Sequence, residues 1–501
     1  MEGLESIFVL VGFLTVFNGL VALWLLLYGL NSLFLTLMNK PAPRSTTSLP
    51  PEELPVVTVQ LPIYNERYVV QRLVDAVCQL DYPRDRLFIQ VLDDSTDDTR
   101  TILQTIVAEY QAKGHWISYT HRSHREGFKA GALQAGLTAA QGEFIAMFDA
   151  DFVPEPSWLK ETISHFFNYP AADRIGVVQT RWGHLNPNYS LLTKLQAVCL
   201  DGHFMVEQQS RSVNNWLLNF NGTAGIWRKE AILSSGGWQG DTLAEDTDLS
   251  YRAQLQGWRI LFDRTIVAPA ELPVAMAAFK LQQFRWAKGT IQCAKKLLPQ
   301  VWSHPQLSYL AKIQATIHLT GYATQLFALG ALLLAIPTML LLPQDVPTLK
   351  ESVMSFWGFI TPAALGPTIL YLAGQRAIYP KSWWQHIDRV FLLSLLGTGL
   401  SLNNSRAVLE GLFNYGVHFR RTPKFNIKTT ADRWQDKVYK LPFDPMALGE
   451  LALCVYGLIA MVVAWRESFF TSLPYLLMYT IGYGYVGGLT LWQAWQQQGR
   501  Q

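Results

Sequence analysis

Residues Ile7 to Met38 form a long apolar run that contains no Lys, Arg, Asp or Glu. A helix needs about 20 such residues to cross the hydrocarbon core of a bilayer. The run is too long for the core of a signal peptide, and no small-residue cleavage site follows it before Lys40. We therefore expect residues 1–40 to form an N-terminal transmembrane anchor that is retained in the mature protein.

Charged residues at the two ends of this run predict its orientation. Glu2 and Glu5 precede the run, whereas Lys40 and Arg44 follow it. Loops rich in Lys and Arg stay on the cytoplasmic side of a membrane. We therefore expect the chain beyond a linker rich in Pro, Ser and Thr, residues 41–55, to face the cytoplasm, at the plasma membrane if the chain is bacterial.

Further apolar runs follow residue 300, so we expect residues 301–501 to form a transmembrane bundle and the chain to be a multi-pass membrane protein. Charged residues make up 16% of the chain, whereas soluble proteins carry about 25%. Four of these runs are read as membrane spans: Ile313–Leu342, Ser352–Leu372, Met446–Trp465 and Leu473–Trp495.

The segment Val390 to Val417 fits two interpretations. It begins apolar, then contains Asn403, Asn404 and Arg406, and a basic stretch follows it. If that basic stretch is cytoplasmic, the segment cannot cross the membrane an odd number of times. The charge bias therefore favours a re-entrant or interfacial helix near residues 390–417. The alternative is one more ordinary span with an unusual outer loop.

The charge balance and the cysteines argue against other classes of protein. The chain has 41 Lys and Arg against 38 Asp and Glu, a net charge of +3, whereas a nucleic-acid binder shows a strongly basic face. Its four cysteines include no CxxC pair, so neither a zinc ribbon nor a redox motif is supported. We expect no nucleic-acid partner.

Residues 56–300 have ordinary charge density and alternate between strand and helix patterns. This alternation predicts an α/β domain with a mostly parallel sheet, whose ligands lie beyond the carboxyl ends of the strands. Near residues 280–300 we expect an interfacial helix. The predicted strands are Val56–Leu61, Leu87–Leu92, Ile117–His121 and Phe144–Phe148, and the predicted helices between them are Glu66–Leu80, Thr99–Tyr110 and Phe128–Ala140.

Acidic residues follow two of these strands. Asp149 and Asp151 come directly after Phe144–Phe148, and two carboxylates with this spacing can share Mg²⁺ together with substrate phosphate oxygens. Asp93 ends Leu87–Leu92 and is a candidate to hold the base or ribose of a nucleotide. The alternatives are a solvated acidic turn and a helix N-cap formed by the residues after Asp93.

Three later segments carry further candidate groups. Lys129 lies in a Gly-containing loop that runs into a helix, an arrangement that suits an anion. Glu245 and Asp246 open a helix, where a carboxylate either caps the helix or acts as a base. In the segment Gln282 to Trp286, Arg285 could clamp a diphosphate and Trp286 could stack on a sugar. The alternative for this last segment is an interfacial helix anchored by Trp and Arg.

These pieces together resemble the processive, inverting family 2 glycosyltransferases, which include cellulose synthases, hyaluronan synthases and plant-type mannan and glucan synthase-like proteins. The family pattern is D, DxD, ED and QxxRW, in that order. The chain shows it as Asp93, Asp149-Ala-Asp151, Glu245-Asp246 and Gln282-x-x-Arg285-Trp286. Two loops also resemble nucleotide-binding loops of the family, and two segments resemble the mannan and glucan branch: Pro62–Glu66 and Lys129–Gly131, then Val178–Trp182 and Phe220–Arg228.

The resemblance implies a GT-A fold, a nucleotide-diphosphate sugar donor (UDP-glucose or GDP-mannose) and Mg²⁺ or Mn²⁺ as cofactor. It implies that Asp246 is the general base and that Asp149 and Asp151 hold the metal. The implied donor-binding residues are Tyr64, Glu66, Asp93, Lys129, Asp149, Gln282 and Arg285. The implied acceptor-binding residues are Gln179, Asn221, Gly222, Thr223, Glu245 and Trp286.

Three functions are compatible with parts of this pattern. The first is a synthase of a β-linked glucan or mannan coupled to export, with the bilayer and a growing glycan as partners. The second is a non-processive glycolipid synthase that adds one sugar to diacylglycerol or ceramide. The third, a channel with a nucleotide-binding domain, leaves the order of the motifs unexplained. Because Asn221 to Thr223 replaces the cysteine-containing acceptor motif of bacterial cellulose synthase, and no cyclic-dinucleotide-binding domain follows the last run, cellulose is not the favoured product.

Overall fold

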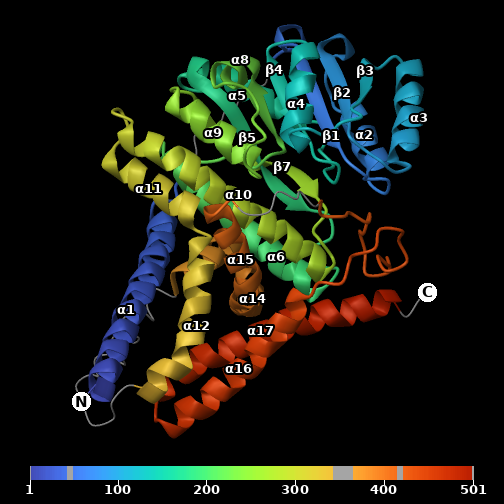
Figure 1. Cartoon of the computed structure of the whole chain (residues 1–501). Helices are drawn as coiled ribbons and strands as arrows, with labels where there is room; N and C mark the ends of the chain where they lie inside the picture. The colour runs from blue at the N-terminus through green and yellow to red at the C-terminus, as the bar shows by residue number, and fades with distance from the viewer. Residues whose placement is uncertain (1, 42–48, 342–364, 415–420, 499–501) are drawn as a thin grey trace.

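The computed structural model describes residues 2–41, 49–341, 365–414 and 421–498. Figure 1 shows an α/β domain at one end of the molecule and long helices at the other, with helix α10 (Met276–Ser303) lying between them. Residues 42–48 of the predicted linker and residues 352–364 of the predicted span Ser352–Leu372 lie outside the described residues.

The centre of the α/β domain is a seven-stranded sheet in the order β3-β2-β1-β4-β6-β5-β7. Strand β6 runs antiparallel to both of its neighbours, and all other neighbouring strands are parallel. The predicted mostly parallel sheet is confirmed, although its second half was not predicted. The strands are β1 (Val57–Ile63), β2 (Leu87–Asp93), β3 (Ile117–His121), β4 (Phe144–Met147), β5 (Ile175–His184), β6 (Gly225–Arg228) and β7 (Arg259–Ala270).

Apolar cores cover both faces of this sheet, as strand β4 shows. Phe144 and Ala146 belong to one core, whereas Ile145 and Met147 belong to the other, because successive side chains of a strand point to opposite faces. Helices supply the opposing surfaces through apolar residues at helical spacing. The helices of this domain are α2 (Val70–Cys78), α3 (Thr99–Ala112), α4 (Phe128–Ala139), α5 (Trp158–Asn168), α6 (Leu191–Gly202), α7 (Gln209–Val213), α8 (Lys229–Ser234) and α9 (Glu245–Leu255).

Three described helices are long and apolar enough to cross a membrane: the segment Val9–Leu37 of α1 (Glu2–Leu37), α12 (Ala323–Leu341) and α16 (Met446–Arg466). The predicted span Ile313–Leu342 is wrong in one respect, because its first half is a separate helix that ends near Gly321. The other helices of this part are α11 (Tyr309–Thr320), a helix over residues 365–378, α14 (Ile387–Gly399), α15 (Ser401–Leu412) and α17 (Leu473–Gln498).

The ambiguous segment after Val390 forms the two helices α14 and α15. They contain 13 and 12 residues, each fewer than the roughly 20 that a crossing helix needs. Helix α15 packs against α10. The re-entrant or interfacial interpretation stays a prediction, and residues 415–420 lie outside the described part.

Three lysines of helix α10, spaced eight residues apart, form ion pairs with three neighbouring helices. Lys280 Nζ lies 2.5 Å from Glu450 Oε1 of α16, and Lys288 Nζ lies 3.0 Å from Glu410 Oε2 of α15. Lys296 Nζ lies 2.8 Å from Asp248 Oδ1 of α9. Because buried charges are costly unless paired, these contacts fix α10 between the α/β domain and the long helices.

Candidate active site

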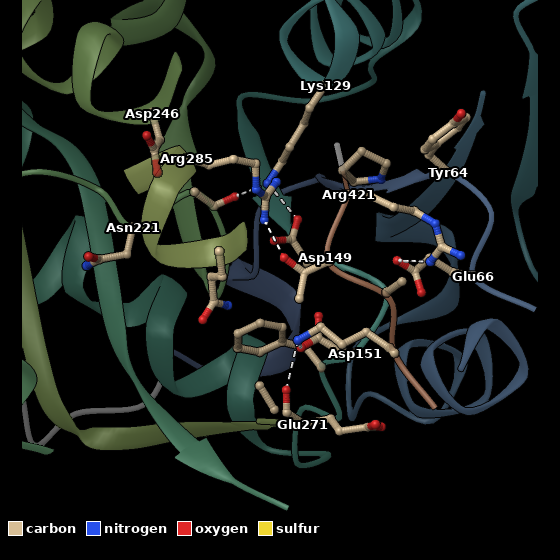
Figure 2. A pocket seen from close by; sticks show the side chains of 18 of the residues that line it. Tyr64, Glu66, Lys129, Asp149, Asp151, Asn221, Asp246, Glu271, Arg285 and Arg421 are labelled. Carbon is tan, nitrogen blue, oxygen red and sulfur yellow. Dashed lines mark hydrogen bonds and ion pairs between the residues drawn. The ribbon is translucent and has the colours of Figure 1, made fainter. Parts of the chain in front are cut away.

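A cavity of about 220 Å³ lies beyond the carboxyl ends of β1 and β4, at the edge where ligands bind in such sheets. It brings together residues from loops and helices that are far apart in the sequence (Figure 2). The predicted site residues that line it are Tyr64, Glu66, Lys129, Asp149, Asp151, Asn221, Gly222, Glu245, Asp246, Gln282, Arg285 and Trp286.

The cavity has two distinguishable sides. In Figure 2, Tyr64 and Glu66 lie on one side and Asp246 and Asn221 on the other, with Asp149 and Lys129 between them. The guanidinium of Arg125 covers the ring of Tyr64, 3.4 Å from its centroid. The first side therefore carries a tyrosine ring stacked against a guanidinium, and the second carries a carboxylate and an amide.

The structure places Asp93 away from the cavity. Its side chain is fully buried, where Oδ2 accepts a hydrogen bond from the Tyr119 hydroxyl at 2.7 Å and Oδ1 accepts one from the Ser95 amide at 2.9 Å. The adjacent Asp94 lines the cavity instead and forms a two-bond ion pair with Arg122. The structure therefore does not support the predicted contact between Asp93 and a donor.

Gln179 and Thr223 also lie behind the cavity lining. Gln179 is fully buried in β5, accepts a hydrogen bond from the Asn221 amide at 2.8 Å and donates to the Thr223 carbonyl. The Thr223 hydroxyl accepts a bond from the Asp149 amide at 2.9 Å. These two side chains hold the loop that ends in β6, so the predicted direct contact with an acceptor is not what the structure supports for them.

Lysine side chains neutralise the two aspartates of the DxD segment. Lys129 Nζ lies 2.5 Å from Asp149 Oδ1, and Lys424 Nζ lies 2.6 Å from Asp151 Oδ2. The side chain of Asp149 is 37% exposed and lines the open cavity, whereas the side chain of Asp151 is 10% exposed.

These two carboxylates suit a divalent cation whose remaining ligands are oxygen atoms of the substrate. Among the described residues, no group of three or more His, Cys, Asp or Glu side chains is placed to hold a metal ion. Mg²⁺ characteristically takes one or two carboxylates and draws its other ligands from phosphate and water. Asp149 and Asp151 would therefore hold the cation only together with a diphosphate, in place of the lysine contacts.

Asp246 opens helix α9 on the opposite side of the cavity. Burial, together with the neighbouring Glu245 carboxylate, raises the pKa of Asp246 to about 7, against the opposing charge of Lys129. Burial likewise raises the pKa of Glu245. A carboxylate with a pKa near neutrality is suited to accept a proton from a hydroxyl group.

Gly222 lets the chain pass close to Asp246. Its φ of +80° is left-handed, its carbonyl accepts a hydrogen bond from Lys129 at 2.9 Å, and a Cβ atom there would lie 2.8 Å from Asp246 Oδ2. Glycine is favoured at such a position because it has no Cβ.

We expect Gly222→Ala to lower kcat by about 100-fold, because a small displacement of a reacting group has an effect of this size. Gly257→Ala is the matched control, since Gly257 also has a left-handed φ of +92° but nothing within 4 Å of its added Cβ. Both variants should lose some thermal stability, and only Gly222→Ala should lose activity. Equal activity in the two variants would contradict the assigned contact.

The sequence interpretation missed one wall of the cavity, which the segment Arg421 to Lys424 forms. Arg421 Nη1 lies 3.2 Å from Glu66 Oε1, and the Thr422 hydroxyl accepts a hydrogen bond from Arg285 at 3.0 Å. Burial raises the pKa of Glu66 to about 8, although the Arg421 charge opposes it. The basic character of this segment is visible in the sequence, but by itself it indicates only a side of the membrane.

Glu271, at the end of β7, was also missed. It is 2% exposed, and its carboxylate accepts hydrogen bonds from Arg72 at 3.1 Å and from the Phe425 amide at 3.0 Å. Its carbonyl accepts a bond from Lys424 at 2.8 Å. Glu271 therefore anchors the Arg421–Lys424 wall next to the DxD segment.

Comparison with known proteins matches residues 55–289 to a family described as "Glycosyltransferase like family 2". Glucomannan 4-beta-mannosyltransferase 1 from Oryza sativa subsp. japonica is 32% identical over 466 residues, which are 89% of this chain and 86% of that protein. Glucomannan 4-beta-mannosyltransferase 2 from Arabidopsis thaliana is 35% identical over 366 residues, and the match spans 72% of this chain but only 66% of the relative.

Among solved structures, a mannosyltransferase from Pyrobaculum calidifontis in complex with GDP-Man and Mn²⁺ is 19% identical. The match covers 82% of this chain and 100% of that one, with a TM-score of 0.48. The predicted GT-A-like fold is confirmed by the family match together with the mostly parallel sheet. The chain is therefore a glycosyltransferase of family 2, in the cellulose synthase-like branch to which the plant glucomannan 4-β-mannosyltransferases belong.

Proposed function

We propose that this chain is a membrane-embedded, inverting enzyme that transfers mannose from GDP-mannose to the end of a growing β-linked mannan. The names of its relatives support mannose over the UDP-glucose alternative. The observation that carries the proposal is that Asp246 and the pair Asp149–Asp151 line one cavity, with Asp149 between Asp246 and the side that carries Tyr64 and Glu66 (Figure 2). Asp246 would act as the base, and Asp149 and Asp151 would bind the diphosphate in the same cavity.

The donor side divides into a nucleoside end and a diphosphate end. Tyr64, Glu66 and Asp94 line the first end and would contact the nucleoside. Lys129 and Arg285 would face the diphosphate, where fixed positive charges stabilise the negative charge that develops as it leaves. A Mg²⁺ or Mn²⁺ ion bound by Asp149 and Asp151 would add Lewis-acid stabilisation of the same leaving group.

The acceptor side would position one hydroxyl group of the glycan. Asp246 accepts its proton, so the oxygen can attack the anomeric carbon from the side opposite the diphosphate. A single displacement of this kind inverts the anomeric configuration and gives a β-linkage from an α-linked donor. Asn221 lies on this side, Trp286 lines the same cavity, and both would contact the terminal sugar.

The bilayer would lie next to this acceptor side. Helix α10, which carries Gln282, Arg285 and Trp286, packs against α11, α15 and α17. The basic residues around the predicted spans support a catalytic domain on the cytoplasmic side. A glycan made beside these helices could leave the cytoplasm as it grows.

The test is to incubate the purified chain in lipid nanodiscs with Mn²⁺ and either radiolabelled GDP-mannose or radiolabelled UDP-glucose. We expect label from GDP-mannose in an alkali-stable polymer that a β-mannanase digests. Label from UDP-glucose alone would contradict the proposed donor. Label in a solvent-extractable lipid would contradict the polymer and support the glycolipid alternative.

The rate should rise with pH through about 7. Asp246 accepts a proton only when it is ionised, and burial and Glu245 raise its pKa to about 7. We therefore expect kcat/KM, which reports the free enzyme, to be about tenfold lower at pH 6 than at pH 8. The measurement is a pH series at saturating Mn²⁺. A rate that falls as pH rises over this range would contradict the assignment.

A further inference from the structure

The side chain of Asn221 is held by neighbours in one orientation. Its Oδ1 lies 3.1 Å from His203 Nε2 and accepts a hydrogen bond from Asn219 Nδ2 at 3.2 Å. Its backbone amide donates to Gln179, as described above. With Oδ1 directed at His203 and Asn219, the Nδ2 group is buried and has no hydrogen-bond partner among the described residues. An unpaired buried donor is unfavourable unless a ligand accepts its bond.

His203 begins a π-helical turn, His203–Gln208, that follows α6. π-Helical turns inside helices occur frequently at functional sites. Here the turn carries both His203 and Glu207, and His203 Nδ1 lies 2.8 Å from Glu207 Oε2. Gln208, from the same turn, donates to the Asn219 carbonyl at 3.0 Å. One turn therefore contacts both asparagines.

The Glu207 carboxylate gives this turn a fixed negative charge. Burial alone would raise the pKa of Glu207, but the hydrogen bond and charge of His203, together with the charge of Arg211, lower it below its usual value. Both nitrogens of His203 thus face oxygen atoms, one of Glu207 and one of Asn221. Gln208 Nε2 also lies 3.4 Å from His203 Nε2, so three neighbouring side chains hold the ring in one orientation.

We propose that His203, oriented by Glu207, is a positioning residue that presents the Asn221 amide N–H₂ group to the terminal sugar of the acceptor. The proposal rests on the proposed function of the cavity and assigns new roles to His203 and Glu207, neither of which lines it. A sugar hydroxyl that accepts a bond from Asn221 Nδ2 satisfies the group that the described residues leave unpaired. His203 therefore affects acceptor binding and not donor binding.

The test is a double-mutant cycle on His203→Ala and Asn221→Ala, with GDP-mannose, Mn²⁺ and a β-1,4-linked mannose hexamer as probes. We expect each single variant to raise the KM for the hexamer by about five- to tenfold, the effect of losing one hydrogen bond. The double variant should be no worse than Asn221→Ala, because His203 acts through Asn221. The dissociation constant of GDP with Mn²⁺ should change less than twofold.

Controls separate positioning from general structural damage. His203→Gln retains a donor and should recover most of the lost affinity for the hexamer, and the nearly isosteric Glu207→Gln should show a smaller rise in KM than His203→Ala. His304→Ala removes a histidine that bonds the Leu255 carbonyl and does not line the cavity, so its KM should be unchanged. Additive effects in the double variant, or an equal loss of GDP binding, would overturn the proposal.

A structural measurement that needs no catalysis tests the role of His203 independently of the proposed donor. In a cryo-EM map of His203→Ala, the Asn221 side chain should leave the rotamer of the wild-type chain. If wild-type chain transfers no mannose, the proposed donor fails while this comparison still decides the role of His203. An unchanged Asn221 rotamer would contradict the inference even if the donor is GDP-mannose.

Discussion

Asp246→Asn should lower kcat for sugar transfer by about 10²- to 10⁴-fold, the usual contribution of a positioned general base. The substitution keeps the size of the side chain and removes only its ability to accept a proton. Asp246 lies on the side of the cavity opposite Tyr64 and Glu66. The affinity for GDP with Mn²⁺ should therefore stay within about twofold of wild type, because a base that does not touch the donor makes no contribution to its binding.

Asp241→Asn is the matched control for this experiment. Asp241 lies just before α9, is exposed, and pairs with Lys296 at 2.8 Å without lining the cavity. Exposed ion pairs contribute little, so its kcat should be unchanged. Strong loss of GDP binding in Asp246→Asn would show that Asp246 is a donor ligand and not the base.

Asp151→Ala should have the largest effect on donor binding. Even partners that only orient a metal ligand contribute 10- to 100-fold to affinity, so loss of a ligand should weaken Mn²⁺-dependent binding of GDP by roughly 100-fold or more. GDP binding in the presence of EDTA should change much less, since Lys129 and Arg285 remain. Isothermal titration with and without Mn²⁺ measures both.

An exposed aspartate in the turn before β5, Asp173, provides the control variant Asp173→Ala, which should bind GDP as wild type does. If wild-type chain bound GDP equally well with Mn²⁺ and with EDTA, and transferred sugar without a divalent cation, the metal role of Asp149 and Asp151 would be wrong.

Local sequence patterns were sufficient to predict some of the site. The run Phe144–Met147 is apolar on both faces, so it had to be a buried strand, and it delivers Asp149 to the ligand edge of the sheet. Asp246 and Arg285 were found through motifs on two helices. Their meeting in one cavity follows from the sheet order, which no local pattern contains.

Other parts of the site depend on contacts that sequence does not show. Lys424 contacts Asp151 across 273 residues, and nothing near either residue indicates the other. Asp93 and Asp94 are neighbours whose side chains point in different directions, so composition could not say which one faces the cavity. The break between α11 and α12 near Gly321 could not be predicted from hydropathy, because an average over many residues does not detect an interruption of one or two.

The most direct single measurement is a cryo-EM map of the chain in nanodiscs with GDP and Mn²⁺. We expect metal density between the diphosphate and the carboxylates of Asp149 and Asp151, with Lys424 withdrawn from Asp151 and with Asp246 facing the open side of the same cavity. Metal and nucleotide bound elsewhere, or Asp246 separated from them by protein, would contradict the proposed mechanism.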